Sequence, residues 1–511
     1  MKPVATAPSS LRGTAENGVA NVRHAPANGS AARPATGGGA PDPRLPLGKL
    51  TRLGLGDRVP PAAIFQKLEE IARLPYVERV LALPDVHWKD QMEIPSSISI
   101  ATRNVVVPEF TSAAVNDGMG VVRTSLQEHD VTPERLARFF TGINANSAAH
   151  FFDTNRYSIS GEELQRAVVA GAAGLVSRYG LQESVLDRFE DGGRVPDRGD
   201  GPMALGEVVP FPLLATRFSR SEMGLNFGGN HFLEVQVVDE VLDAEMAARW
   251  GFERGAVVVM YHLGPGPFGA TLLHHYSRRL KLPASRVPLF LLSKLLFHYV
   301  QRAGRGDLAR KWDLHFRFNQ RTPLAVQSEE GRLVREALAM AINFGYGYRL
   351  ATLRAILDGL RESISPDVEA ELFCDISHNG VAERRTDFGI ECVARHNACR
   401  LESGAPTIVA GSCDVPSYLG IGDERIEARL DSYDHGAGHL IDRYREAGRL
   451  SVTAGVVERF RMTRGRDARI LRHDQAPVRS AEPIERLMEC FQQRRMMRPV
   501  VRLRPLGNLK N

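Results

Sequence analysis

Cysteine is scarce in this sequence, with five residues of this type among 511. No two of them form the closely spaced pairs of a zinc ribbon, and five scattered thiols do not make the framework of a disulfide-stapled domain. Both kinds of protein are therefore disfavoured, and a reducing, cytoplasmic compartment is expected. The cysteines are Cys374, Cys392, Cys399, Cys413 and Cys490.

Long apolar runs and a strong charge of one sign are also missing. No stretch approaches the roughly 20 apolar residues that cross a bilayer, and the first residues lack the apolar segment of a secretory signal. We therefore expect a soluble protein without a membrane segment. Lys and Arg (65) exceed Asp and Glu (60) by five, which neither requires nor excludes a polyanionic partner. Two arginine-rich runs, 461–473 and 494–504, are typical either of phosphate binding or of a solvated surface.

Large aliphatic and aromatic side chains are nearly absent from residues 1–44, which are rich in Ala, Gly, Pro, Asn and Ser. Such a composition buries too little apolar surface to order a backbone, so a disordered tail is predicted. Residues 45–511 are expected to form one catalytic domain of the α/β (α+β) class with mixed sheets, in which residues 185–205 are a peripheral insertion. The alternation behind this prediction comprises strands at 79–86, 256–264, 371–378 and 406–412 and helices at 61–74 and 331–357.

Five histidines share one kind of setting, either at a predicted strand end or in a turn rich in Gly and Asn. Loops at strand ends converge on a common cleft in α/β proteins, and neutral imidazole is the commonest side-chain ligand of transition metals. One such histidine would be more typical of the core or the surface, whereas several together predict a central, histidine-lined metal cleft. They are His87, His231, His262, His378 and His435, and the acceptors Asp85, Asn230, Glu234 and Asp375 lie within three residues of one of them.

His435 stands at the head of a glycine turn, DHGAGH. Glycines at 436 and 438 permit close approach of the backbone to a ligand, and a helix beginning near His439 would offer its first amide groups to a phosphate. This pattern suits a histidine that becomes nucleotidylated or phosphorylated while metals and cations bear the developing charge. An incidental histidine in a turn that initiates a helix is the alternative.

A series of segments from about Leu81 to the C-terminus resembles the RtcB family of RNA ligases. In family order they are LPDVHW, NDGMG, GGNHFLEVQ, YHLGPG, SHN, ARHNACR, VAGSCDVPSY, DHGAGH and RPLGNLKN. That family joins RNA ending in a 3′-phosphate or 2′,3′-cyclic phosphate to RNA with a 5′-hydroxyl, using GTP and manganese. The resemblance therefore implies an RNA ligase of tRNA processing or RNA repair, with GTP and one or two Mn²⁺ ions as cofactors and RNA ends as partners.

The resemblance also implies a role for individual residues. His435 falls on the guanylylated histidine, and Arg400 falls on an arginine that holds phosphate. The metal-binding positions fall on His231, His262 and His378, with Asp117 as the available carboxylate. The nucleotide-binding positions fall on Asn230, Glu234, His378, Asn379, Ser412, Ser417, Gly436, Ala437, Gly438 and Lys510.

The segment NDGMG departs from the family at the metal site. There the family has an aspartate and a cysteine, and the same positions hold Asn116 and Met119. An amide and a thioether are poor ligands for manganese, so at least one metal position is expected to be weakened or lost. Asp117 is one residue away, and in an extended backbone adjacent side chains face opposite ways. It would therefore reach the site only through a bulge or a local shift.

Three functional hypotheses remain open on the sequence. The first is a GTP-dependent RNA ligase with a modified metal site. The second is a related enzyme with a different phosphoryl or nucleotidyl transfer, such as RNA end processing or capping. The third is a catalytically reduced protein that binds RNA ends. Retention of His435 and three metal-type histidines argues against the third hypothesis, and the loss at Asn116 and Met119 argues against the first in its unmodified form.

Overall fold

The computed structural model describes residues 48–55, 60–88, 93–146, 154–196, 201, 203–221, 223–280, 284–304, 307–423, 430–462 and 471–510. The tail predicted for residues 1–44 lies outside these ranges. In the part of the chain that is described, no helix combines the length and the apolar character needed to cross a bilayer.

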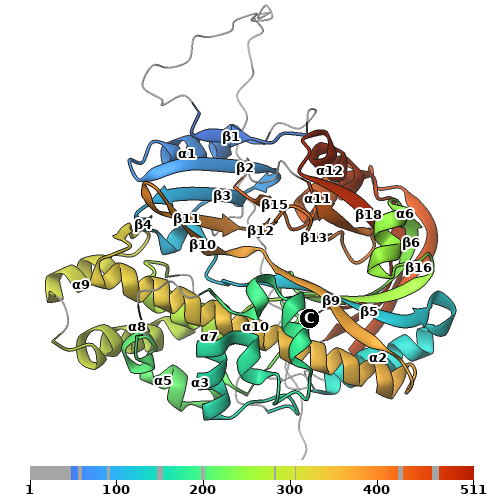
Figure 1. Cartoon of the computed structure of the whole chain (residues 1–511), viewed down its shortest axis with the longest axis horizontal. Coiled ribbons are helices and arrows are strands. Elements are labelled where there is room, and N and C mark those ends of the chain that lie inside the picture. Colours follow the sequence, from blue (N-terminus) through green and yellow to red (C-terminus); the bar gives the residue numbers. More distant parts are fainter. Residues whose placement is uncertain are drawn as a thin grey trace, which may run out of the picture. The chain divides into compact units, whose positions relative to one another are not determined.

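The largest sheet in the described ranges has nine strands and is mixed (Figure 1). Its path runs β13-β14-β18-β6-β7-β5-β9, and β16 joins it by pairing in parallel with β18. Strand β7 is buried along its whole length, which explains its continuous apolar run. The strands are β5 (Gly118–Gln127), β6 (Phe232–Val241), β7 (Ala256–Leu263), β9 (Ala370–Ser377), β13 (Pro406–Val409), β14 (Ser417–Gly422), β16 (Val452–Met462), β17 (Leu471–Arg479) and β18 (Met497–Lys510).

A second sheet has five strands in the order β1-β2-β3-β11-β10. Two short pairs, β12 with β15 and β4 with β8, complete the strands of the described residues. The bounds are β1 (Leu50–Arg52), β2 (Val77–His87), β3 (Ser96–Arg103), β4 (Val105–Val106), β8 (Leu324–Ala325), β10 (Asn379–Thr386), β11 (Gly389–His396), β12 (Ala398–Arg400) and β15 (Ser432–Asp434). The mixed α/β class and the strands expected from the sequence are thus confirmed.

Helix α10 (Glu329–Ser363) is the longest described helix and packs against α2, α3 and α7 (Figure 1). Ser328 caps it by accepting a hydrogen bond from the Gly331 amide, and two glutamates in its first turn suit the helix dipole. The helices are α1 (Ala62–Ala72), α2 (Pro133–Asn146), α3 (Gly161–Ala170), α4 (Leu205–Val208), α5 (Phe211–Ala215), α6 (Ala244–Trp250), α7 (Gly266–Tyr276), α8 (Val287–Leu295), α9 (Leu308–His315), α11 (Gly438–Glu446) and α12 (Glu482–Gln493).

Two apolar cores follow from strand alternation. Along β7 the side chains at 256, 258 and 260 join one core, and those at 257, 259 and 261 join the other. The strands β2, β3 and β11 are divided in the same way, with Leu81, Ala101 and Val393 in the first of these cores and their chain neighbours Val80, Ile100 and Cys392 in the other. The other contains the buried face of α10. His262 continues the even-numbered series of β7, and it therefore stands on the face of the nine-stranded sheet that packs into the first core.

Residues 185–205, which the sequence suggested as a peripheral insertion, make specific contacts with β9. The described part of this segment contains the short 3-10 turns η4 (Glu183–Arg188) and η5 (Glu190–Gly193). Phe189 is buried and forms a β-bridge with Asp375, and Glu190 accepts hydrogen bonds from the amide and hydroxyl of Ser377. The segment therefore packs against β9, because its aromatic and acidic side chains find partners there.

Arginines of the run 494–504 form ion pairs with acidic side chains. Arg498 pairs with Asp243, Arg502 with Asp239, and Arg504 with Glu128. These arginines support the solvated-surface interpretation of the run rather than the phosphate-binding one. Most of the run 461–473 lies outside the described residues.

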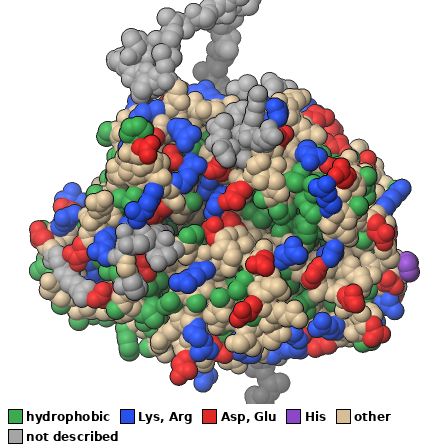
Figure 2. Space-filling view, in the orientation of Figure 1, with side chains coloured by type: hydrophobic (Ala, Val, Ile, Leu, Met, Phe, Trp, Pro, Cys, Tyr) green, Lys and Arg blue, Asp and Glu red, His purple; other side chains and the backbone are tan. Residues whose placement is uncertain are grey.

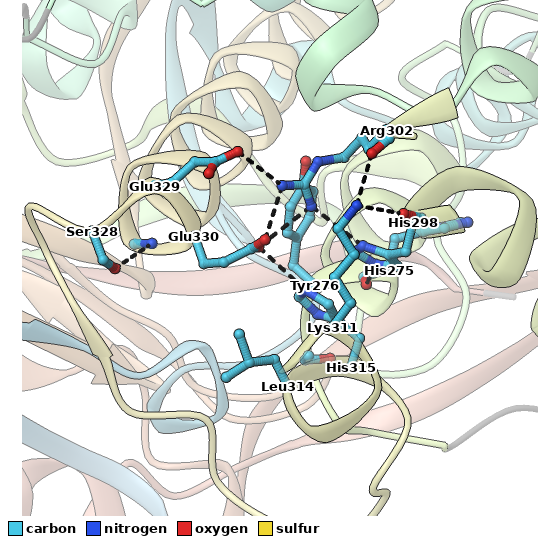
Figure 3. A network of polar contacts seen from close by, with 12 residues as sticks. His275, Tyr276, His298, Arg302, Lys311, Leu314, His315, Ser328, Glu329 and Glu330 are labelled. Atoms are coloured by element: carbon cyan, nitrogen blue, oxygen red, sulfur yellow. Dashed lines mark hydrogen bonds and ion pairs between the residues drawn. The ribbon is translucent and has the colours of Figure 1, made fainter. Parts of the chain in front are cut away.

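A second group of histidines is buried in the helical part, away from the predicted site (Figure 3). His298 and His315 stack with ring centroids 3.8 Å apart. His315 Nε2 lies 3.3 Å from Glu330, whose carboxylate also accepts a hydrogen bond of 2.9 Å from Arg302. His275 contributes its backbone carbonyl, which lies 2.8 Å from His298 Nε2.

This histidine group predicts acid sensitivity. Burial lowers the pKa of His275 to about 3 and holds the pKa of His298 well below its ordinary value. The unfolded chain takes up protons below about pH 6.5 that the folded core does not, so the free energy of unfolding falls as the pH falls. A histidine that stays neutral at pH 5 lowers that free energy by about 2 kcal/mol.

Urea denaturation at pH 7.5 and pH 5 tests this expectation. His275→Gln removes one titrating ring and should make the pH dependence shallower, whereas His129→Gln, at a side chain that is 83% exposed, should leave it unchanged. Equal pH dependence in the wild type and in His275→Gln would contradict the assignment.

Candidate functional site

Asp117 reaches the site because the backbone turns immediately before β5. Asn116 adopts a left-handed conformation, with φ of 59°, which asparagine tolerates better than most residues. Asp117 then shares a face of the sheet with Met119, which pairs with His262 and belongs to the first of the two cores. The left-handed turn is the local shift that Asp117 was expected to need, since it sends Asn116, and not Asp117, to the opposite side.

Arg349 on α10 holds this turn in place. Its fully buried guanidinium donates to Asp375, with a shortest distance of 2.7 Å, and to the backbone carbonyl of Asn116. The Asn116 side-chain amide donates to the carbonyl of Ile342 at 2.6 Å. A Cβ at Gly118 would lie 2.8 Å from the Ile376 carbonyl and 2.9 Å from Arg349 Cζ, so glycine is required where the turn enters β5.

Three neighbouring strands bring Asp117 together with two histidines. Strand β5 lies between β7, which carries His262, and β9, which His378 follows. The Nε2 atoms of His262 and His378 are 3.2 Å apart. Asp117 Oδ1 lies 3.2 Å from His262 Nε2, and Oδ2 lies 3.5 Å from His378 Nε2. His231, directly before β6, places its Nε2 3.4 Å from Asp117 Oδ2.

The chemistry of these donors fits a metal ion. Candidate ligand atoms of Asp117, His262 and His378 all lie within 4.8 Å of one another, and the three residues are buried. Asp117 Oδ1 is buried without a hydrogen-bond partner. Two Nε2 atoms at 3.2 Å cannot both carry a proton directed at the other, so at least one lone pair points into the cluster. Imidazole and carboxylate together suit a transition-metal dication.

Electrostatics supports the same conclusion. Burial raises the pKa of the Asp117 carboxyl, but the facing His231, His378 and His262 outweigh it and hold that pKa well below its ordinary value. Burial lowers the pKa of His262 to about 4. At neutral pH the cluster therefore offers an ionised carboxylate and a neutral His262 ring, which are the forms that bind metals.

His435 lies directly against this cluster. Its ring stacks on that of His378 with centroids 4.4 Å apart and an interplanar angle of 16°, and its centroid is 6.0 Å from that of His262. Nδ1 of His435 is 3.2 Å from the backbone carbonyl of Asn397. A carbonyl oxygen can only accept, so Nδ1 carries the proton, and in the neutral ring Nε2 has the lone pair for attack on an electrophile.

The turn that carries His435 is fixed by backbone pairing. The Ala410 amide donates to the His435 carbonyl at 3.1 Å, and the Ala437 amide donates to the Ala410 carbonyl at 3.0 Å. Helix α11 begins at Gly438, as the sequence suggested, but its first amides have a protein partner. The Asp85 carboxylate accepts from the amides of His439 and Leu440, at 3.3 and 2.9 Å. These two amides are therefore not available to a phosphate.

Several of the predicted nucleotide-binding residues gather on the β6, β14 and β18 side of the cluster. Glu234 accepts hydrogen bonds of 2.7 Å from both Gln236 and Asn508, and Gln236 also donates to Ser417 Oγ at 3.2 Å. Burial raises the pKa of Glu234 to about 8, against the lowering effect of these two amides and Lys510. The group is thus a buried acid surrounded by amide and hydroxyl groups.

Other predicted residues are placed differently. Asn230 is exposed, and the Ser412 hydroxyl donates to Asp414 at 2.8 Å. Asn379 accepts the Asn397 amide at 2.9 Å and so fixes the loop whose carbonyl orients His435. His87 is not part of the Asp117, His262 and His378 cluster, and its ring stacks on His439 with centroids 4.6 Å apart.

Sequence reasoning missed two residues that organise the site. Arg349 sits inside an otherwise apolar stretch of α10, and a charged side chain in the buried face of a helix was a signal that a buried ion pair exists. Asn397 is left-handed, with φ of 51°, and its backbone carbonyl orients His435. A role that a backbone carbonyl performs cannot be predicted from a pattern of side chains.

Known proteins match this chain over most of its length. The family model described as "tRNA-splicing ligase RtcB" matches residues 67–511. The protein named tRNA-splicing ligase RtcB in Methanococcus maripaludis is 25% identical over 403 residues, covering 74% of this chain and 77% of that protein. Its namesake in Archaeoglobus fulgidus is 25% identical over 477 residues, covering 87% and 90%. That in Pyrococcus horikoshii is 26% identical over 421 residues, covering 77% of this chain but only 44% of the longer relative. With its histidine cluster and a family match over residues 67–511, the chain belongs to the RtcB family.

Proposed function

We propose that this protein is a GTP-dependent RNA ligase that joins an RNA 3′-phosphate or 2′,3′-cyclic phosphate to an RNA 5′-hydroxyl in the cytoplasm. One observation carries the proposal. His435, with its Nε2 lone pair preserved, stacks on His378 at the edge of a buried carboxylate and imidazole cluster. A nucleophilic histidine beside a group of candidate metal ligands suits nucleotidyl transfer.

The proposed reaction has two transfers through His435. Nε2 attacks the α-phosphorus of GTP, so that a P–N bond forms as the P–O bond to pyrophosphate breaks. The RNA 3′-phosphate oxygen then takes the GMP group and releases the histidine, and the 5′-hydroxyl displaces GMP to form the phosphodiester. A cyclic phosphate must first be opened by water to the 3′-phosphate. His435 Nδ1–H donates to the Asn397 carbonyl, and this hydrogen bond keeps Nε2 as the nucleophile.

Asp117, His231, His262 and His378 would hold the metal, for which manganese is the proposed ion. Bound there, the metal would neutralise developing charge on phosphate oxygens. Met119 adds no anionic ligand, so the one carboxylate carries the whole compensation for the cation's charge. The gathered donors suit a single ion, and a second ion would need ligands from the substrates.

The nucleotide is assigned to the side of the cluster where Glu234, Ser417 and Lys510 lie. Amide and carboxyl groups there match the hydrogen-bonding edge of a purine base. The turn at Gly436, Ala437 and Gly438 approaches from the His435 side, and a Cβ at Gly438 would meet nothing within 4 Å, which leaves space for a bound group. Asn230 and Ser412 complete the proposed set from neighbouring loops.

The test uses the full chain with Mn²⁺, α-phosphate-labelled GTP and a pair of RNA oligonucleotides, one ending in a 3′-phosphate and the other starting with a 5′-hydroxyl. We expect an acid-labile, base-stable label on the protein and a joined RNA product. A label that moves to RNA without joining would favour end capping instead. No label and no product across several metals and nucleotides would overturn the proposal and favour an RNA-end-binding protein.

A further inference from the structure

A large cavity opens on the side of the histidine cluster away from Glu234 and Ser417. Its volume is about 710 Å³, within the range of roughly 300–1,000 Å³ that is usual for ligand sites. It reaches the cluster through Ser377 and Asn379, which flank His378 along the chain. Strand β10, at the edge of the five-stranded sheet, and its partner β11 form one wall.

Arg395 is the residue in this wall whose side chain has a hydrogen-bond donor without an acceptor among the described residues. Its side chain lines the cavity, although the residue is only 6% exposed. Its Nε donates to Ser432 Oγ at 2.9 Å, and its Nη2 donates to the carbonyls of Leu430 and Asp431 at 2.8 and 3.2 Å. No described residue accepts a hydrogen bond from its Nη1, and none forms an ion pair with it.

Arg395 has no ion-pair partner among the described residues. Burial lowers its pKa to about 10 and Arg400 and Arg384 add to that effect, while Glu190 and Asp431 oppose it. The nearby acids are engaged elsewhere, because Arg400 pairs with Asp191 at 2.7 Å and Arg384 pairs with Asp431 at 2.8 Å. A buried cation with one open donor is stabilised by an anion that enters the cavity.

The cavity continues into a more basic hollow. A second pocket of about 250 Å³ shares Arg335, Arg385 and Ile390 with the first, and Gln327 and Arg332 complete its lining. The first pocket mixes basic with acidic side chains, whereas the second has three arginines and no acid among its lining residues. Figure 2 shows Lys and Arg side chains beside Asp and Glu near the middle of one face. The hollow adds Arg332 to the arginines of the cavity, while Arg335 is paired there with Glu383 at 2.6 Å.

We propose that this two-part groove binds a single-stranded segment of the substrate RNA, with a phosphate on Arg395 and the strand leading outward past Arg335 and Arg385. The inference rests on the proposed function and assigns its RNA to a path on the other side of the cluster from Glu234, Ser417 and Lys510. A path lined by several arginines suits a polyanionic strand better than a single small anion. Tyr346 is the aromatic residue in the lining and is fully buried, so recognition is of the backbone and not of sequence.

Gly380 offers a way to block the groove without removing a charge. It faces Arg395 directly across the β10–β11 pair, so a side chain there would stand beside the guanidinium. A Cβ at Gly380 meets only Ile342 Cδ1, at 4.0 Å, and its backbone is not left-handed. Gly380→Leu therefore fills the cavity and keeps the fold.

The test measures binding of a fluorescein-labelled single-stranded RNA by anisotropy at 50 and 200 mM salt, with a 3′-phosphate strand and a 5′-hydroxyl strand as separate arms. Arg395→Gln and Gly380→Leu should each weaken binding about 10-fold or more, and Arg395→Gln should reduce the salt slope by about one. If only one of the two RNA strands binds more weakly to the variants, that strand is the one that occupies the groove. Arg103→Gln, whose partner Glu78 lies outside the groove, is the matched control and should bind RNA as the wild type does.

Labelling with α-phosphate-labelled GTP is recorded on the same proteins. Loss of RNA binding with the label retained supports the groove. Loss of RNA binding in proteins where even the wild type takes no label supports the groove but refutes the ligase proposal. RNA binding unchanged in both variants, or loss of the label with RNA binding intact, overturns the groove. If Arg395→Gln fails to fold, Gly380→Leu decides the question alone.

Discussion

His435→Gln is expected to abolish both the covalent guanylate and RNA joining. In the proposed reaction Nε2 of His435 forms the P–N bond, and an amide nitrogen at this position is not nucleophilic. The neighbouring His378 cannot take over, because its Nε2 faces His262 and Asp117 at 3.2 and 3.5 Å. The loss should therefore reach the detection limit and not stop at a partial reduction.

Gel autoradiography with α-phosphate-labelled GTP measures the label, and product formation from the two RNA oligonucleotides measures joining. His87→Asn is the matched control, because His87 was also a candidate on the sequence but stacks on His439 outside the metal-type cluster. It should keep the label. Label that persists in His435→Gln would refute His435 as the nucleophile, whatever happens to joining.

Asp117→Asn should weaken metal binding at least about 100-fold, more than the loss of a group that only orients a ligand, and should abolish joining with it. Asp117 is the one carboxylate among the described residues of the cluster, and its loss would leave the imidazoles of His231, His262 and His378 to face a dication. Titration calorimetry with Mn²⁺ measures the first effect without any RNA or GTP. Metal affinity equal to that of the wild type would show that Asp117 is not a ligand.

Asn116→Asp tests whether position 116, where the family has an aspartate, or position 117 supplies the metal ligand. If position 116 carried the metal ligand, adding a carboxylate there would strengthen binding and would restore it in the double variant with Asp117→Asn. In the structure the Asn116 amide donates to the Ile342 carbonyl at 2.6 Å, on the other side of the strand. We therefore expect Asn116→Asp to lose that hydrogen bond, to lower stability and to restore no metal binding. Rescue in the double variant would contradict the placement of Asp117.

The sequence predicted those strands and turns that depend on residue patterns within a single segment. The apolar run 256–264 predicted β7 because a strand covered on both faces reads as continuously apolar. The glycine turn before α11 and the placement of His231, His262 and His378 near strand ends also followed from local composition. The contacts of the segment 185–205 with β9 could not be predicted, since its glycines and charges are typical of a surface loop and its partners lie far away in the chain.

By itself, the sequence determined the mixed α/β class, the family and the histidines around which the site is built, because these depend on residue types and on their spacing along the chain. Only the tertiary structure decided that Asp117 and not Asn116 faces those histidines. That choice depends on a left-handed turn at Asn116, which Arg349 holds from a helix more than 200 residues away. It decided in the same way that Arg395 lines a cavity with an open donor, since the groups that bury it come from three separate strands and loops. Side-chain direction and charge compensation are set by contacts between distant segments, and spacing along the chain does not encode them.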